Sequence, residues 1–97
     1  MEFKQLEMFV AVAEERSIIR AAARVFRTQP AVSMSLAKLE QEIGSYLFYR
    51  SRERRFHLTN AGEVLHDYAK RLLALRDEAA AVVTKGPFEC SQARAAS

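Results

Sequence analysis

Residues 28–44 read TQPAVSMSLAKLEQEIG, and their small and polar members recur at a spacing that gathers them on one side of a helix. The outward or flanking members are Pro30, Ser33, Met34, Ala37, Lys38 and Gln41. Gln29 and Ser33 can form hydrogen bonds with base edges or phosphates, and the small and apolar neighbours allow close approach to a thymine methyl group. Free N–H groups at the start of the helix, near Thr28, favour a phosphate. This chemistry suits a helix that enters the major groove of DNA.

A run of arginines, RSRERR at 50–55, forms the second candidate site. Residues 16–58 carry nine basic residues against three acidic ones, whereas residues 1–15 carry one against four. A segment this basic suits a polyanion, and guanidinium groups at a hairpin tip can reach the minor groove or the DNA backbone. A solvated surface without a partner is the plainer interpretation of any charge cluster taken alone. The candidate arginines are Arg50, Arg52, Arg54 and Arg55.

The residue types that enzymes and metal sites use are not arranged for catalysis. His57 and His66 lie nine positions apart, without a cysteine or carboxylate cluster at the spacing of metal ligands. We expect His57 in the hairpin and His66 on an exposed helix face. Ser17, Ser33 and Ser35 lack a recognisable base and orienting group, so capping and surface roles suit them better. We therefore predict no enzyme activity, no metal and no cofactor.

The composition predicts a soluble, cytoplasmic, single-domain protein. The chain has 97 residues, of which 49% are hydrophobic, so general disorder is excluded. No segment approaches the roughly 18 consecutive apolar residues of a membrane span. The N-terminal sequence MEFKQLEMF mixes charged and apolar residues, unlike a secretory signal. Cys90 is the single cysteine, which fits a reducing compartment, and we interpret it as incidental rather than as a redox switch.

Three helices are expected before residue 45. The first has its apolar face at Leu6, Phe9, Val10 and Ala13. Ser17 can cap the second, because its hydroxyl accepts a hydrogen bond from a free N–H of the first turn. The apolar stripe of the second helix is Ile18, Ala21, Ala22 and Val25. Thr28 can cap the third, with Pro30 in the first turn and Gly44 at the end. The buried face of the third helix is Val32, Leu36, Leu39 and Ile43.

A small β-hairpin and one long helix are expected next. The runs LFY at 47–49 and FHL at 56–58 flank the arginine segment and would form the two strands. The long helix starts at Thr59-Asn60, supported by a capping-box pairing of Asn60 with Glu63. Nothing breaks this helix before Gly86.

Apolar residues along the long helix alternate in spacing between four and three, which defines a heptad seam. The seam consists of Ala61, Leu65, Tyr68, Leu72, Leu75, Ala79 and Val82. A helix of this length cannot bury the whole seam against the small domain before it. We expect the first two turns to pack on their own domain and the rest to pair with a second copy. The candidate dimerisation residues are Leu65, Tyr68, Leu72, Leu75, Ala79 and Val82.

Four segments in order resemble a known family. LEMFVAVAEERS, AAARVF, TQPAVSMSLAKLEQEIGSYLFYR and LTNAG have the order and spacing of the winged helix-turn-helix of LysR-type transcriptional regulators. The resemblance implies a mainly α fold with a short β-hairpin wing and a long C-terminal linker and dimerisation helix. The implied boundaries are a DNA-binding domain at 1–59, with the helix-turn-helix at 18–37 and the wing at 47–58, a linker helix at 60–85 and a tail at 86–97.

The function implied by the resemblance is sequence-specific regulation of transcription, by a dimer that binds an inverted-repeat promoter site in double-stranded DNA. The DNA-binding candidates are Thr28, Gln29, Pro30, Ser33, Met34, Ser35, Ala37, Lys38, Arg50, Arg52, Arg54 and Arg55. The alternative from another class is a protein-interaction module, in which the long amphipathic helix recruits a partner and no specific DNA binding occurs.

The sequence also departs from the family pattern. Met34 stands where the family often has a DNA-contacting arginine, and Ile19 where it often has a hydroxyl residue. Members continue for about 200 further residues as an effector domain, more than the usual size of one domain. That domain is absent here, so we expect a DNA-binding fragment or a natural truncation. The resemblance admits a tetramer in a full-length form, and a small-molecule effector only with the missing domain.

Overall fold

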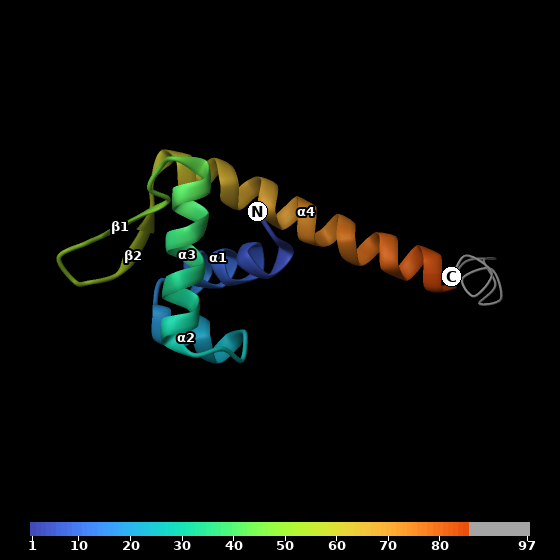
Figure 1. The fold of residues 1–97 in the computed structure, drawn as a ribbon, viewed down its shortest axis with the longest axis horizontal. Helices are drawn as coiled ribbons and strands as arrows, with labels where there is room; N and C mark the ends of the chain where they lie inside the picture. The colour runs from blue at the N-terminus through green and yellow to red at the C-terminus, as the bar shows by residue number, and fades with distance from the viewer. Residues whose placement is uncertain (86–97) are drawn as a thin grey trace.

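The computed structural model describes residues 1–85, so the predicted tail and Cys90 lie outside the described residues. The elements in chain order are α1 (Phe3–Glu15), α2 (Ile18–Arg24), α3 (Gln29–Ile43), β1 (Phe48–Arg50), β2 (Phe56–Leu58) and α4 (Asn60–Lys85). Figure 1 shows α3 crossing α1, with the hairpin projecting on one side and α4 running out on the other. The prediction of a mainly helical fold with a short hairpin is confirmed.

The predicted boundaries of α2 and α3 are confirmed by their capping hydrogen bonds. The Ser17 hydroxyl accepts from the N–H of Arg20 at 3.2 Å, and the Thr28 hydroxyl accepts from the N–H of Ala31 at 3.2 Å. Gly44 ends α3 with a φ of 81°, a left-handed conformation that favours glycine. These short-range signals fix where the two helices of the helix-turn-helix begin and where α3 ends.

The predicted start of α4 at Thr59-Asn60 is confirmed, but the predicted capping box is wrong. Thr59, and not Asn60, caps the helix, because the Thr59 hydroxyl accepts from the N–H of Gly62 at 3.0 Å. The same hydroxyl donates to the carbonyl of Tyr46 at 2.7 Å. Glu63 hydrogen-bonds through its backbone N–H to the carbonyl of Thr59, instead of pairing with Asn60 in a capping box. Thr59 therefore combines a local cap with a contact to the loop before β1.

The hydrophobic core gathers one face of each helix of the N-terminal domain. The largest fully buried side chains are Phe9, Leu39, Leu47, Val12 and Val32. Predicted core positions at Leu6, Val10, Ala21, Ala22 and Leu36 are also buried. Ile43 was expected on the same face but is 40% exposed, because α3 ends there and its last turn projects past the core.

The hairpin has two distinct faces. Its strands are antiparallel and pair Phe48 with Leu58, Tyr49 with His57, and Arg50 with Phe56. The inner face packs on the core, since the ring of Phe48 lies 5.3 Å from Phe9 and 5.7 Å from Phe56. Side chains alternate between faces along a strand, so Tyr49 and His57 lie on the outer face, where their rings stack at 5.3 Å.

The first turns of α4 hold the long helix against the domain. Ala61, Leu65 and Leu73 are partly buried against the core, and Ala69 is fully buried. Leu65 packs on its own domain, as expected for the first two turns of the helix, and its part in a dimer interface stays a prediction. At 1.5 Å per residue the 26 residues of α4 span about 39 Å, so most of the helix extends beyond the core. Within residues 1–85, no helix has the length and apolar character needed to cross a membrane.

Candidate nucleic-acid interface

The outward face of α3 has the predicted residues, with one exception. Six of the seven exposed members are small or polar and the seventh, Met34, is 61% exposed. The exposed members are Thr28, Gln29, Pro30, Ser33, Met34, Ala37 and Lys38. Ser35 is the exception, because its hydroxyl oxygen is buried and has no hydrogen-bond partner. The structure therefore gives no support to the prediction that Ser35 contacts DNA, because its hydroxyl is turned away from the exposed face.

An open groove of about 670 Å³ joins the start of α2, the start of α3 and the hairpin. It brings the predicted Gln29, Pro30 and Ser33 together with the predicted arginines of the hairpin. The groove is lined by Glu15, Arg16, Ser17, Ile18, Ile19, Arg20, Gln29, Pro30, Ser33, Arg50, Arg54, Arg55 and Phe56. Two candidate sites that are separated in the sequence thus form one continuous surface.

The basic side chains on this surface are free of carboxylate partners. Within residues 1–85, none of Arg16, Arg20, Arg27, Lys38, Arg50, Arg52, Arg54 and Arg55 forms an ion pair. The one acidic residue of the groove, Glu15, is turned toward Arg24, with 3.5 Å between the carboxylate and the guanidinium. The groove is therefore strongly positive, as a polyanion site requires.

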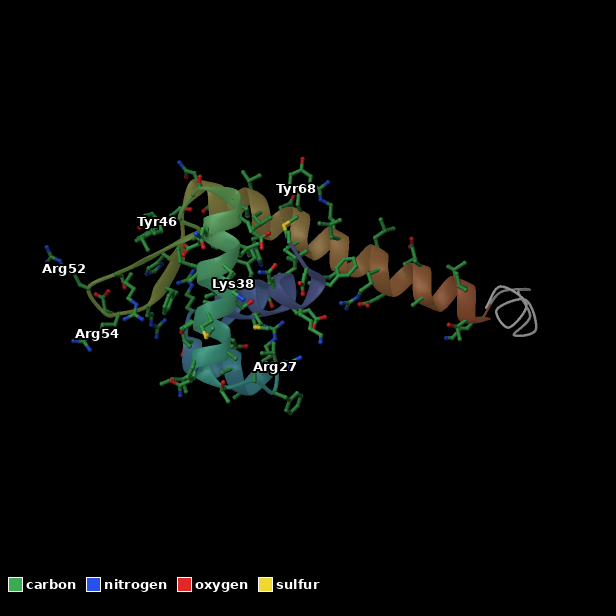
Figure 2. All side chains as sticks on the ribbon, viewed as in Figure 1. Arg27, Lys38, Tyr46, Arg52, Arg54 and Tyr68 are labelled. Atoms are coloured by element: carbon green, nitrogen blue, oxygen red, sulfur yellow. The ribbon has the colours of Figure 1, made fainter. Side chains whose placement is uncertain are left out.

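The hairpin arginines occupy different positions. Arg50 lies over the ring of Phe56 at 4.7 Å, a cation–π contact that holds its guanidinium beside the groove. Arg54 has a φ of 61° and forms part of the turn, where its N–H donates to the carbonyl of Ser51. Arg52 does not line the groove, and Figure 2 shows Arg52 and Arg54 at the far end of the hairpin, pointing away from the helices.

A second exposed surface runs along α4. Tyr68, Leu75 and Val82 are 53–59% exposed and Leu72 is 37% exposed, so these apolar side chains are not covered by the rest of the described chain. Ala79 is exposed as well. Val64 and Val83 are each 59% exposed beside this seam, and a single heptad register left them out. Figure 2 shows Tyr68 projecting from the side of α4 away from α3.

The comparisons with known proteins agree with this geometry. The family profile described as bacterial regulatory helix-turn-helix protein, lysR family, matches residues 3–63. The chain belongs to the LysR family. Its relative BudR, an HTH-type transcriptional regulator of Klebsiella aerogenes, is 44% identical over 79 residues, which are 81% of this chain and 54% of BudR. This chain thus spans about half the length of BudR. A second relative, a probable RuBisCO transcriptional regulator of Cyanidioschyzon merolae, is 45% identical over 74 residues, which are 76% of this chain and 24% of that regulator.

Solved structures of DNA complexes have the same fold as this LysR-family chain. The BenM_DBD/benA site 1 DNA complex is 34% identical with a TM-score of 0.83, covering 88% of this chain and 98% of that one. The CbnR_DBD-DNA complex is 34% identical with a TM-score of 0.77, covering 99% and 98%. The predicted family and a DNA-binding, non-enzymatic class are confirmed.

Sequence reasoning did not single out four residues that lie on the groove or beside α3. Arg16 and Arg20 entered only as part of a charge count, Ile19 only as a departure from the family, and Tyr46 not at all. Arg16, Ile19 and Arg20 line the main groove, and Tyr46 is 79% exposed beside α3. The available signal was the position of Arg16 and Arg20 on either side of the Ser17 cap, at the end of α1 and the start of α2. No local pattern marked Tyr46, which is placed by tertiary contacts.

The prediction that His66 lies on an exposed helix face is wrong. Its Nε2 atom is buried without a hydrogen-bond partner and lies 3.6 Å from the carboxylate of Glu14. Its ring stands edge-on to Phe9 at 6.4 Å between centroids, so His66 packs at the joint between α4 and α1. Among residues 1–85, no three histidine, cysteine or acidic side chains are grouped closely enough to hold a metal ion.

Proposed function

We propose that this chain is the DNA-binding part of a transcription regulator and recognises its site specifically. In this proposal α3 enters the major groove, where Gln29 and Ser33 read base edges. Arg50, Arg54 and Arg55 reach the adjacent minor groove or the backbone. The observation that carries the proposal is the single groove that joins these residues, with basic side chains that have no carboxylate partner within the described part of the chain.

The proposal includes a homodimer formed through α4. Exposed apolar side chains that recur along one helix stabilise a helical pair when a second copy covers them. The supporting residues are Tyr68, Leu72, Leu75, Ala79 and Val82, with Val64 and Val83 beside them. A symmetric dimer presents two copies of α3 related by a two-fold axis, so its promoter site is an inverted repeat.

The cellular setting follows from the same proposal. A chain of this kind acts on the bacterial nucleoid in the cytoplasm. A small-molecule effector and a tetramer belong in this proposal to full-length forms, because this chain covers only 27–28% of the full-length CbnR and full-length BenM structures that it resembles. The domain boundaries at residues 59 and 85 are proposed on the capping of α4 by Thr59 and on the span of that helix.

Binding-site selection tests the proposal. Duplexes of random sequence are incubated with the protein, recovered by mobility shift and sequenced over several rounds. We expect an enriched inverted repeat, and a labelled enriched duplex that scrambled DNA of the same composition displaces poorly. No enrichment, or displacement by scrambled DNA at the same concentration as by the enriched duplex, would show that the chain lacks specific recognition.

A further inference from the structure

A narrow groove separates α3 from the hairpin. Its volume is about 190 Å³, and its lining comes from both walls: Ile18, Ser33, Leu36, Ala37, Glu40, Tyr46, Phe48 and Phe56. In duplex DNA, one sugar–phosphate strand separates each major groove from the neighbouring minor groove. If α3 lies in the major groove and the hairpin in the minor groove, that strand must cross this gap. The inference therefore rests on the proposed function.

Tyr46 is the exposed aromatic residue in the gap. Figure 2 shows it near the base of the hairpin, beside α3. It also lines a second open groove of about 440 Å³ with Ala37, Gln41 and Gly44. Its side chain is 79% exposed, whereas the next residue, Leu47, is completely buried. A large aromatic side chain that is left this exposed beside a binding face is well placed to contact a partner.

The backbone around Tyr46 is held firmly. Its carbonyl accepts a hydrogen bond from the Thr59 hydroxyl at 2.7 Å, and the N–H of Leu47 donates to the Glu40 carboxylate at 2.8 Å. The Leu47 carbonyl accepts from the N–H of Thr59 at 3.0 Å. The start of the tyrosine side chain is therefore fixed before any ligand arrives, which lowers the entropic cost of binding.

We propose that Tyr46 contacts the DNA backbone, with its phenolic O–H donating a hydrogen bond to a phosphate oxygen of the strand that crosses the gap. A phenol supplies the donor that a phosphate oxygen accepts, and contacts of this kind position a protein on DNA without reading sequence. The charges agree, because Arg50, Arg54 and Arg55 lie along the adjoining groove. The carboxylate of Glu40 in the gap is engaged by the Leu47 N–H.

Tyr49 provides a matched control on the same hairpin. It is 56% exposed, but it stacks on His57 on the outer face, and it lines neither groove beside α3. Tyr46→Phe and Tyr49→Phe remove the same hydroxyl from two exposed rings, so both variants should keep the wild-type unfolding midpoint. Only the first should change DNA binding.

The experiment measures affinity for the duplex enriched by selection and for its scrambled version, at several salt concentrations. Tyr46→Phe should weaken both about tenfold for each subunit on the DNA, which is the usual range for one hydrogen bond to a charged acceptor. The slope of log affinity against log salt should not change, because a neutral hydroxyl releases no counterion. Tyr49→Phe should match the wild type.

A scan with single methylphosphonates, which replace one charged phosphate oxygen with a methyl group, locates the contact. One position in each half-site should weaken the wild type about tenfold more than it weakens Tyr46→Phe. Wild-type affinity in Tyr46→Phe, or equal losses in both proteins at every position, would overturn this inference and leave the proposed function standing. A wild-type chain that binds neither duplex would overturn both.

Discussion

The arginines that line the groove between the helix-turn-helix and the hairpin differ from those on the side of the molecule where α1 meets α4. On the α1–α4 side the arginines are paired: Arg76 with Glu7 at 2.6 Å and with Asp77, and Arg24, at the end of α2, with Glu14 of α1 at 2.8 Å. The lysines of that side, Lys4, Lys70 and Lys85, form no ion pair within residues 1–85. On the other side, the basic side chains of the groove have no ion pair within residues 1–85. Arginine therefore has two roles in this chain: some arginines form ion pairs within the fold, and others leave their charge exposed in the groove.

The difference separates the arginines that have carboxylate partners within the chain from those whose charge is left for a partner molecule. The hydrogen bond from Arg76 to Glu7 raises the pKa of Arg76, and it ties α4 to α1 across the joint. Exposed pairs of this kind add little to stability, because water and salt screen them, so their contribution is mainly to orientation. Unpaired arginines in one groove repel each other, and a polyanion relieves that repulsion.

The largest expected effect comes from the start of α4, where the helix packs against the backbone and side chains of the hairpin segment. Gly62 is buried at the start of α4, and a Cβ there would overlap the backbone carbonyl oxygen of Leu47 and press on Leu58. Gly62→Ala should lower the free energy of unfolding by about 3 kcal/mol, measured by urea denaturation. Gly44→Ala is the control, because it meets only the left-handed backbone penalty of about 1 kcal/mol. Equal losses in the two variants would contradict the close packing at Gly62.

The next effect concerns the exposed seam of α4. Leu72→Glu combined with Leu75→Glu should give monomers in sedimentation, because charges would replace the apolar contact between copies. Affinity for the inverted repeat should fall about 100-fold when the two half-sites are no longer bound together. Lys85→Glu changes the net charge by the same amount outside the seam and should remain dimeric. A double variant that sediments as the wild type does would show that α4 pairs through another surface.

A smaller effect separates base reading from charge. Gln29→Ala with Ser33→Ala should reduce discrimination between the enriched and scrambled duplexes by about 1–3 kcal/mol for each base-edge hydrogen bond that is removed. Binding to scrambled DNA should barely change, because the arginines remain. Ser35→Ala is the matched control, since the Ser35 hydroxyl is buried. Equal weakening on both duplexes would mean that Gln29 and Ser33 contact only the backbone.

The smallest effect tests the ion pair between Glu14 and Arg24 on the α1–α4 side. Burial opposes ionisation of Glu14, but the hydrogen bond from Arg24, together with the charges of Arg24, His66 and Lys70, outweighs it and lowers the pKa of Glu14. A lowered carboxyl pKa stabilises the fold above the unfolded-state pKa, and this contribution disappears as the pH falls through the folded-state pKa. Glu14→Gln should therefore be less stable than the wild type at neutral pH, by under about 1 kcal/mol, and the difference should close at acidic pH. A difference that persists unchanged in acid would mean that the charge of Glu14 is not its cause.

Local sequence signals predicted the helix-turn-helix well. Ser17, Thr28 and Gly44 act within one turn of their own helices, so the residue types alone identified these boundaries. The start of α4 at Thr59-Asn60 was predicted as well, but the capping box between Asn60 and Glu63 was not found, because Thr59 caps the helix through the N–H of Gly62. The additional bond from the Thr59 hydroxyl to the carbonyl of Tyr46, thirteen residues earlier, is a long-range contact that no local pattern includes.

The candidate site shows the same limit. Helical spacing placed Gln29 and Ser33 outward, but spacing alone could not distinguish Ser35, whose hydroxyl is buried near the edge of the same face. His66 was assigned to solvent because one helix was considered alone, whereas α1 covers its Nε2 atom. The exposure of Tyr46 depends on the angle between α3 and the hairpin, which no short segment encodes.

The salt dependence of DNA binding tests most directly whether the unpaired arginines are the ones that meet DNA. Removing one arginine that neutralises a phosphate should flatten the slope of log affinity against log salt by about 0.9, and by about twice that when both subunits change. Arg54→Ala and Arg55→Ala should therefore flatten the slope on enriched and scrambled duplexes alike. Arg71→Ala, which removes a cation paired with Asp67 on α4, should leave the slope unchanged while sedimentation confirms the dimer. An unchanged slope in both hairpin variants, or an equal change in Arg71→Ala, would contradict the division between paired and DNA-facing charges.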